Sequence, residues 1–97
     1  MKRRDAINSI NLHKADLVKF GVKSLALCGS VARDEATPES DVDVLVEFTC
    51  PVGLFDFFRV QHYLEDILGV KKVDLLMLTA LKPAFREAML SEAINVA

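Results

Sequence analysis

The chain has 97 residues and a mass of 10.8 kDa, with a hydrophobic fraction of 52% and a mean hydropathy of +0.27. This is enough apolar material for one packed core, so we expect a single domain over residues 1–97, and a disordered chain is excluded. The formal net charge of −2 gives no support for a protein that coats nucleic acid, which would carry a large basic excess. Direct nucleic-acid binding is therefore not expected.

The charge is unevenly distributed along the chain. The segment 34–47 holds six acidic residues and no basic one, so it carries −6, whereas the 12 bases and eight acids outside it leave +4. Two acids in this segment, Asp41 and Asp43, stand beside an apolar strand-like run, and the other acids of the loop are expected to be solvated. We therefore interpret the acidic segment as a cation site and not as a surface for basic partners.

The sequence contains no predicted targeting or membrane-spanning segment. The basic start of the chain is not followed by an apolar run, and the longest apolar runs are far short of the roughly 20 residues that span a bilayer. Cys28 and Cys50 do not form a Cys-x-x-Cys pair and are expected to be reduced thiols. These features predict a cytoplasmic protein that does not contact the membrane.

The first half of the chain predicts helical pieces and two strands. Apolar residues within 1–20 have the spacing of one or two amphipathic helices, which end at Gly21. The apolar run 22–28, closed by Gly29, predicts a buried strand, and the β-branched run 42–48 predicts a second one. A polar stretch broken by Pro38 connects them.

The second half alternates helix and strand. Residues 54–68 predict an amphipathic helix stopped by Gly69, and residues 73–78 predict a third strand. Pro83 suits the first turn of a last helix that runs toward Ala97. This order predicts an α/β (α+β) domain with a small mixed central sheet and helices on both of its faces.

Several conspicuous residues are assigned to ordinary packing. Phe55, Phe57, Phe58 and Tyr63 are predicted to belong to the core, the alternative being a platform for base stacking. The stripe of Phe85, Ala88 and Met89 is also predicted to pack in the core, the alternative being a partner interface. His13 and His62 are isolated and are expected to be surface or packing residues.

Two short patterns carry candidate chemistry. Gly29 and Ser30 follow a strand, where a glycine allows a sharp turn and a serine beside unpaired N–H groups suits a phosphate; an ordinary strand-to-helix turn has the same pattern. Asp41 and Asp43 point to one face of a strand, about 7 Å apart, and suit Mg²⁺; the alternative is a solvated acidic turn capped by Ser40 or Asp41.

Asp74 favours the metal interpretation. It interrupts an apolar strand, where a lone buried carboxylate would be costly, and a neighbouring strand would bring it beside Asp41 and Asp43. Three converging carboxylates can hold two divalent ions that activate an attacking oxygen and stabilise a leaving phosphate. A strand-end aspartate facing solvent is the alternative. The Walker A, Rossmann, zincin and Gly-x-Ser-x-Gly motifs are all missing from the sequence.

The ordered combination of Gly29-Ser30, Arg33, Ser40-Asp41-x-Asp43 and a later strand aspartate, Asp74, resembles the polymerase-beta-type nucleotidyltransferase superfamily. Over nearly the whole chain the sequence is similar to its small single-domain branch, the minimal nucleotidyltransferases. Asp34 stands where a glycine is usual in this family, and Cys28 where an aromatic residue is frequent.

The resemblance implies a fold of the polymerase-beta type and transfer of AMP from ATP to an acceptor hydroxyl, with two Mg²⁺ ions and release of pyrophosphate. It implies that Gly29 and Ser30 hold the β- and γ-phosphates, and that Arg33 and Ser40 belong to the nucleotide site. It further implies that Asp41 and Asp43 bind both metal ions. Asp74 would bind the catalytic ion and help to deprotonate the acceptor.

The resemblance also implies a partner. Minimal members act as antitoxins beside a HEPN-domain toxin, and the implied reaction is adenylylation of this toxin at a tyrosine hydroxyl. Two alternatives stay open at the level of sequence: a non-catalytic antitoxin that neutralises its partner by binding, and a nucleotidyltransferase that acts on a small molecule or RNA. The three aspartates favour catalysis, because a pure binder has no need to place three acids together.

Overall fold

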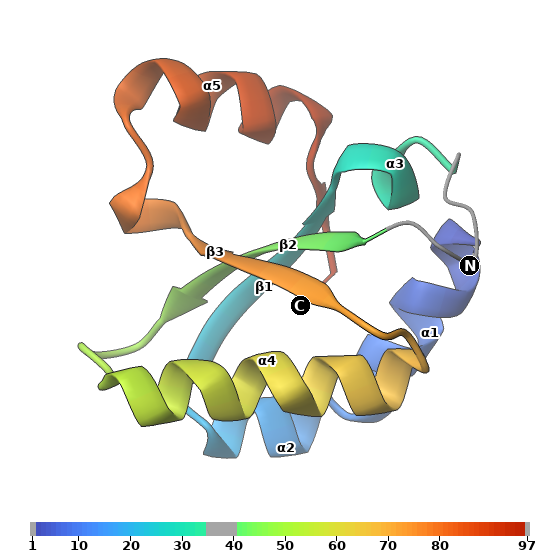
Figure 1. The fold of residues 1–97 in the computed structure, drawn as a ribbon, viewed down its shortest axis with the longest axis vertical. Coiled ribbons are helices and arrows are strands. Elements are labelled where there is room, and N and C mark those ends of the chain that lie inside the picture. Colours follow the sequence, from blue (N-terminus) through green and yellow to red (C-terminus); the bar gives the residue numbers. More distant parts are fainter. Residues whose placement is uncertain (1, 35–40, 97) are drawn as a thin grey trace.

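The computed structural model describes residues 2–34 and 41–96, and for a few residues inside these ranges, Ser30 and Met89 among them, only the backbone. Helices and strands alternate along most of this length (Figure 1). In chain order they are α1 (Arg3–Leu12), α2 (Lys14–Lys19), β1 (Val22–Cys28), α3 (Gly29–Ala32), β2 (Val42–Phe48), α4 (Leu54–Leu68), β3 (Val73–Met77), the 3₁₀ turn η1 (Leu78–Ala80), α5 (Pro83–Glu92) and β4 (Ile94–Asn95).

The strands form one mixed sheet in the order β3-β2-β1-β4. Strand β1 pairs antiparallel with β2 and with β4, whereas β2 and β3 run parallel. The expected small mixed sheet is therefore confirmed, with one strand more than the sequence predicted. Because β2 and β3 start at the end of the sheet where β1 finishes, three chain segments meet at that end.

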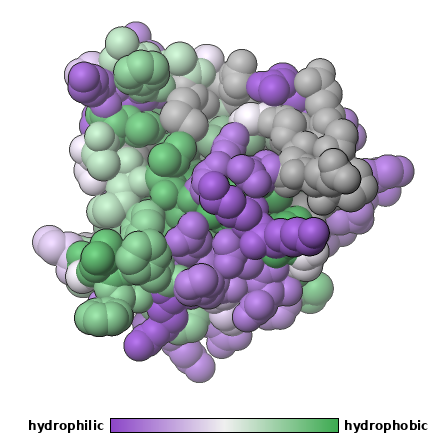
Figure 2. Space-filling model, in the orientation of Figure 1, coloured by the Kyte–Doolittle hydropathy of each residue, from purple (hydrophilic) through white to green (hydrophobic). Residues whose placement is uncertain are grey.

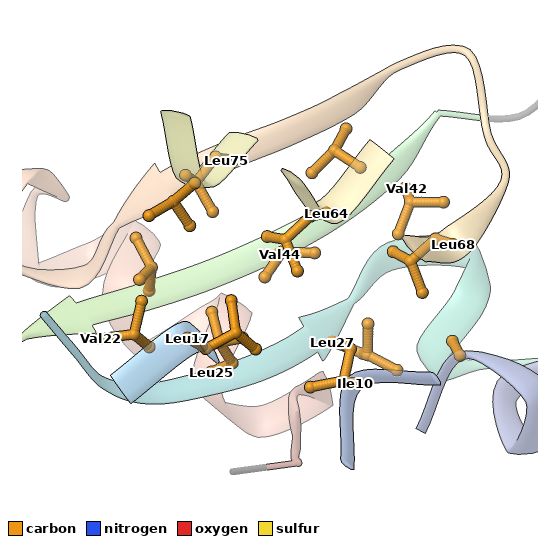
Figure 3. Packing of buried hydrophobic residues seen from close by; sticks show 14 residues of the cluster. Ile10, Leu17, Val22, Leu25, Leu27, Val42, Val44, Leu64, Leu68 and Leu75 are labelled. Atoms are coloured by element: carbon orange, nitrogen blue, oxygen red, sulfur yellow. The ribbon is translucent and has the colours of Figure 1, made fainter. Parts of the chain in front are cut away.

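The core lies between one face of the sheet and the helices α1, α2 and α4 (Figures 1 and 3). Val42, Val44 and Val46 point from β2 toward these helices and are fully or almost fully buried, packing against α4 through Leu64 and Leu68. The period of two along β2 consequently turns Asp43 to the other face. Burial of the valines thus fixes the side of the sheet on which the carboxylate emerges.

Helix α5 lies on the other side of the sheet (Figure 1). The described side chains of α5 are mostly exposed, including Phe85 at 64% and Ala88, so the prediction that these two pack in the core was wrong. The side chain of Met89, the third residue of that stripe, lies outside the described part of the structure. The reason for the exposure is geometric, because α5 contacts the sheet along a short length only. Helices lie on both sides of the sheet, and the dense packing is on one.

Two element boundaries also differ from the sequence prediction. The third strand ends at Met77, and Leu78 begins η1. The last helix ends at Glu92, after which β4 pairs with β1 through Ala26 and Leu27. A two-residue strand takes its hydrogen bonds from a distant neighbour, so the local pattern contains no sign of it. By contrast, Pro83 opens α5 as predicted, and Gly69, with φ +65°, ends α4.

Candidate active site

The candidate site lies at the end of the sheet where β1 finishes and β2 and β3 begin. Asp43, the second residue of β2, is in register with Cys28 on β1 and with Asp74 on β3. The parallel pairing of β2 and β3 therefore sets the two aspartates side by side, as expected from the sequence. Asp41 lies just before β2 and is exposed.

Gly29 lies directly against the carboxylate of Asp43. It follows β1 with φ +69°, a left-handed conformation that glycine adopts without steric cost. A Cβ atom built at Gly29 would overlap Oδ2 of Asp43 and lie 3.3 Å from its Cγ. Position 29 therefore needs a glycine for two separate reasons, its backbone conformation and the space that the Asp43 carboxylate fills.

Burial raises the pKa of Asp43. The negative charge of Asp74, a side-chain hydrogen bond with Asp74 and the charge of Asp41 raise this pKa further, while the positive charge of Arg33 lowers it. Like charges have thus been gathered at a partly buried point, an arrangement typical of functional sites.

Lys72 places a positive charge beside the carboxylates of Asp41 and Asp74. Its Nζ lies 3.5 Å from Oδ1 of Asp74 and 3.9 Å from Oδ2 of Asp41. The backbone of Lys72 is held in place because its carbonyl oxygen accepts a hydrogen bond of 3.3 Å from the N–H of Val42. The sequence interpretation missed this residue, although Lys72 and Asp74 are two positions apart, the spacing that puts side chains on one face of an extended segment.

Helix α4 fixes the start of β3. Gln61 Nε2 donates to the carbonyl oxygen of Val73 at 2.7 Å, and the N–H of Val73 donates to Oε2 of Glu65 at 3.0 Å. Strand β3 is at the edge of the sheet, so these side chains pair backbone groups on its outer side. Gln61 and Glu65 thus hold the backbone of the residue that directly precedes Asp74. Neither was singled out by the sequence.

Asp34 links the loop after the glycine to the N-terminus. Its φ of +59° is in the left-handed region, and its Oδ1 accepts a 2.9 Å hydrogen bond from the N–H of Arg3. Glycine, which adopts this conformation freely, is usual at this position in the family that the sequence resembles. The Arg3 guanidinium donates in turn to the carbonyl oxygen of Ala32 at 3.1 Å. Asp34 thus caps the first turn of α1, whose own N-cap residue provides no side-chain hydrogen bond.

The remaining predicted site residues are described to different extents. Arg33 is exposed, and its charge acts on Asp43. Ser30 lies in α3, directly after Gly29, but its side chain is outside the described part of the structure. Ser40 falls within 35–40 and lies outside the described residues. Their assignment to the nucleotide site therefore stays a prediction.

The donor set suits a hard divalent cation. Asp41, Asp43 and Asp74 offer only carboxylate oxygens, the ligands that Mg²⁺ prefers, and a cationic group, the Lys72 ammonium, already lies against two of them. As the side chains stand, no three His, Cys, Asp or Glu residues within 2–34 and 41–96 are arranged to hold a metal ion. Metal binding would require these carboxylates to turn toward a common centre.

The fold and the site define a nucleotidyltransferase. Residues 8–96 match the family model described as a nucleotidyltransferase domain, so the chain belongs to this family.

In the described residues, no helix has both the length and the apolar character needed to cross a membrane.

Two relatives whose sequences cover most of this chain are named as protein adenylyltransferases. The chain is 39% identical over 88 residues to the protein adenylyltransferase MntA of Thermococcus cleftensis, covering 90% of this chain and 88% of that protein. It is 41% identical over 80 residues to a Methanocaldococcus jannaschii protein provisionally named as a protein adenylyltransferase, covering 82% and 85% of the two chains.

The solved structures agree on the fold. A provisionally named minimal nucleotidyltransferase superposes with a TM-score of 0.84 at 35% identity, covering 97% of this chain and 95% of the other. A chain from a toxin–antitoxin complex with AMP-PNP gives a TM-score of 0.76 at 18% identity, covering 94% of this chain and 72% of that one. At this identity the second likeness concerns the fold alone.

Proposed function

We propose that this chain transfers AMP from ATP to a hydroxyl group, that of a tyrosine, on a HEPN-domain toxin and thereby acts as its antitoxin. The observation that carries the proposal is the register of Asp43 with Asp74, with the Asp43 carboxylate in the space beside Gly29 where a side chain would otherwise lie. Relatives named protein adenylyltransferase support the type of transfer. A structural neighbour, a tri-AMPylated HEPN toxin of Shewanella oneidensis with its antitoxin, supports the class of partner.

The reaction requires a nucleophile, a leaving group and compensation of negative charge. The acceptor oxygen attacks the α-phosphorus, a new O–P bond forms, and the bond from this phosphorus to the oxygen bridging toward the β-phosphate breaks, releasing pyrophosphate. Mg²⁺ would supply charge stabilisation for the triphosphate and for the developing charge at phosphorus. Asp41, Asp43 and Asp74 are the residues that would hold it.

Residues of the chain itself would supply positive charge and accept the proton of the acceptor hydroxyl. Gly29 has no side chain, so the Asp43 carboxylate can lie directly against the turn after β1, and Arg33 adds positive charge near this carboxylate. The half-exposed carboxylate of Asp74 is accessible to an incoming hydroxyl and can take its proton. Positioning and charge compensation are the main contributions expected of an enzyme for this class of reaction.

Exposed apolar side chains support a protein partner. Figure 2 shows hydrophobic surface where α4 begins and over α5. Phe55 is 88% exposed, and Leu54 and Phe58 are exposed beside it, which also shows that assigning Phe55 and Phe58 to the core was wrong. A protein partner could bury these side chains.

ATP as substrate is consistent with the cytoplasmic location expected from the sequence.

Transfer of label from α-labelled ATP to the HEPN partner tests this proposal. We expect labelled partner with the wild-type chain and Mg²⁺, and none with Asp43→Asn. Asp66→Asn is the matched control, because Asp66 is an exposed aspartate on α4 and should leave transfer intact. Neutralisation of the toxin by Asp43→Asn, without label, would instead favour a binding antitoxin. Label on RNA or on a small molecule alone would favour the other alternative.

A further inference from the structure

Lys72 places a positive charge near the oxygen atoms that the proposed function assigns to metal binding. Its Nζ is 3.5 Å from Oδ1 of Asp74 and 3.9 Å from Oδ2 of Asp41. The hydrogen bond from the N–H of Val42 to the Lys72 carbonyl joins its backbone to the start of β2. The same strand pairing that brings the carboxylates together therefore fixes the backbone of Lys72, and this keeps its ammonium group within reach of them.

An ammonium group and a divalent cation compete for such oxygens. Mg²⁺ binds carboxylate oxygens at about 2.0–2.1 Å and demands near-octahedral geometry, so its ligands must turn toward the ion. A positive charge within about 4 Å of the same oxygens repels the ion and offers the carboxylates another partner. Lys72 has a long, largely exposed side chain that can move away into solvent.

We propose that Lys72 is an internal competitor that weakens divalent-metal binding at Asp41 and Asp74 and is displaced when the metal ion binds. This inference rests on the proposed function, because it takes these aspartates as metal ligands. Lys72 thereby sets how tightly the bare ion binds. A triphosphate adds oxygen ligands and negative charge, so the ion is retained well only together with the nucleotide.

Lys71 provides a matched control for this inference. It is an exposed lysine one position earlier, and no ion pair joins it to the aspartates in the described part of the chain. Lys71→Gln and Lys72→Gln change the net charge equally, so any general effect of charge on cation binding cancels between them. Lys72→Arg keeps a positive charge at position 72 and tests whether charge, and not merely the mutation, matters.

The experiment is titration of the full chain with Mn²⁺ alone, without nucleotide, reading free Mn²⁺ from its paramagnetic resonance signal and following the melting temperature in parallel. We expect Lys72→Gln to bind Mn²⁺ about threefold to tenfold more tightly than Lys71→Gln, the range expected for loss of a partly exposed ion pair and of a nearby repulsive charge. Lys72→Arg should bind like the wild type.

Equal or weaker Mn²⁺ binding by Lys72→Gln, relative to Lys71→Gln, would overturn the inference. If Asp43→Asn still abolishes Mn²⁺ binding in that case, the metal site of the proposed function stands and only the role of Lys72 fails. If the wild type shows no saturable Mn²⁺ binding that depends on Asp43, both the competition and the metal assignment fail. The melting curves show whether each variant is folded.

Discussion

The carboxylate of Asp43 occupies the space that a side chain at position 29 would need. Gly29 follows β1 in a left-handed conformation, and a Cβ atom there would overlap Oδ2 of Asp43. The turn and the carboxylate are therefore coupled: the backbone can pass beneath Asp43 only if residue 29 is glycine.

Gly29→Ala should disable the site as well as strain the fold. We expect a stability loss of about 1–2 kcal/mol from the left-handed conformation, and a loss of AMP transfer of about 100-fold because the Asp43 carboxylate is displaced. Gly69→Ala is the control, since Gly69 has φ +65° but open space around its Cβ position. It should lose no more stability than Gly29→Ala in urea unfolding, because only its backbone conformation is affected, and it should keep its activity. Equal activity of both variants would contradict the coupling.

Asp43→Asn should stabilise the chain near neutral pH when divalent ions are removed with EDTA. Burial and the neighbouring Asp74 raise the pKa of Asp43 above its ordinary value, so the protonated form stabilises the fold at pH below that value. This contribution is lost as the pH rises through the raised pKa. Allowing for solvent screening, we expect the substitution to add about 0.5–1 kcal/mol near pH 7 and less at acidic pH.

Thermal unfolding at a series of pH values measures this difference directly. A gain of this size corresponds to about 2–8 °C for a domain of this length. Asp66→Asn should give a curve parallel to the wild type. A loss of stability in Asp43→Asn at neutral pH would show instead that the ionised carboxylate stabilises the fold.

Two substitutions of Asp34 should separate its opposing effects. Asp34→Ala keeps a side chain in the left-handed region and loses the hydrogen bond to the N–H of Arg3, so we expect a loss of about 1–2 kcal/mol. Asp34→Gly also loses this hydrogen bond but removes the strain, so its stability should stay within about 0.5 kcal/mol of the wild type. Urea unfolding of both variants measures the difference. Equal losses would mean that strain at position 34 is negligible.

Glu65→Ala should reduce activity by loosening the start of β3. The N–H of Val73 loses its acceptor, which should cost about 1–3 kcal/mol for a partly buried donor. Misplacement of Asp74 should lower AMP transfer by about tenfold. Glu65→Gln keeps an acceptor oxygen and should retain most of both properties. If Glu65→Gln is as impaired as Glu65→Ala, the negative charge of Glu65, and not the hydrogen bond, is what matters.

Local patterns predicted the elements that build the site. The runs 22–28, 42–48 and 54–68 form β1, β2 and α4 with the expected bounds, because their periodicity and flanking glycines act locally. The pairing of Asp43 with Asp74 followed from placing their strands side by side. Strand β4 depends on pairing with a distant segment and has no comparable local signal. The local signal for Lys72 was its spacing of two positions from Asp74, which the sequence interpretation did not use.

Exposure was also hard to predict from the sequence. Phe55 and Phe85 are apolar, and apolar residues are usually buried, yet both are exposed here. Helix α4 turns Val60, Leu64 and Leu68 inward in place of Phe55, and α5, which carries Phe85, contacts the sheet along a short length only. Phe57 and Tyr63, by contrast, pack against the core as predicted. The left-handed backbone of Asp34 was likewise hidden, although the glycine usual at this position in the family pointed toward it. Composition reports how much apolar surface a chain has, and the fold decides where it lies.

The decisive measurement is the mass of the intact HEPN partner after incubation with this chain, ATP and Mg²⁺. We expect the mass to increase by one or more AMP groups with the wild-type chain and with Asp66→Asn, and to stay unchanged with Asp43→Asn or Asp74→Asn. An unchanged partner mass with the wild-type chain, or a full increase with Asp43→Asn, would contradict AMP transfer by the carboxylates at the β2–β3 edge.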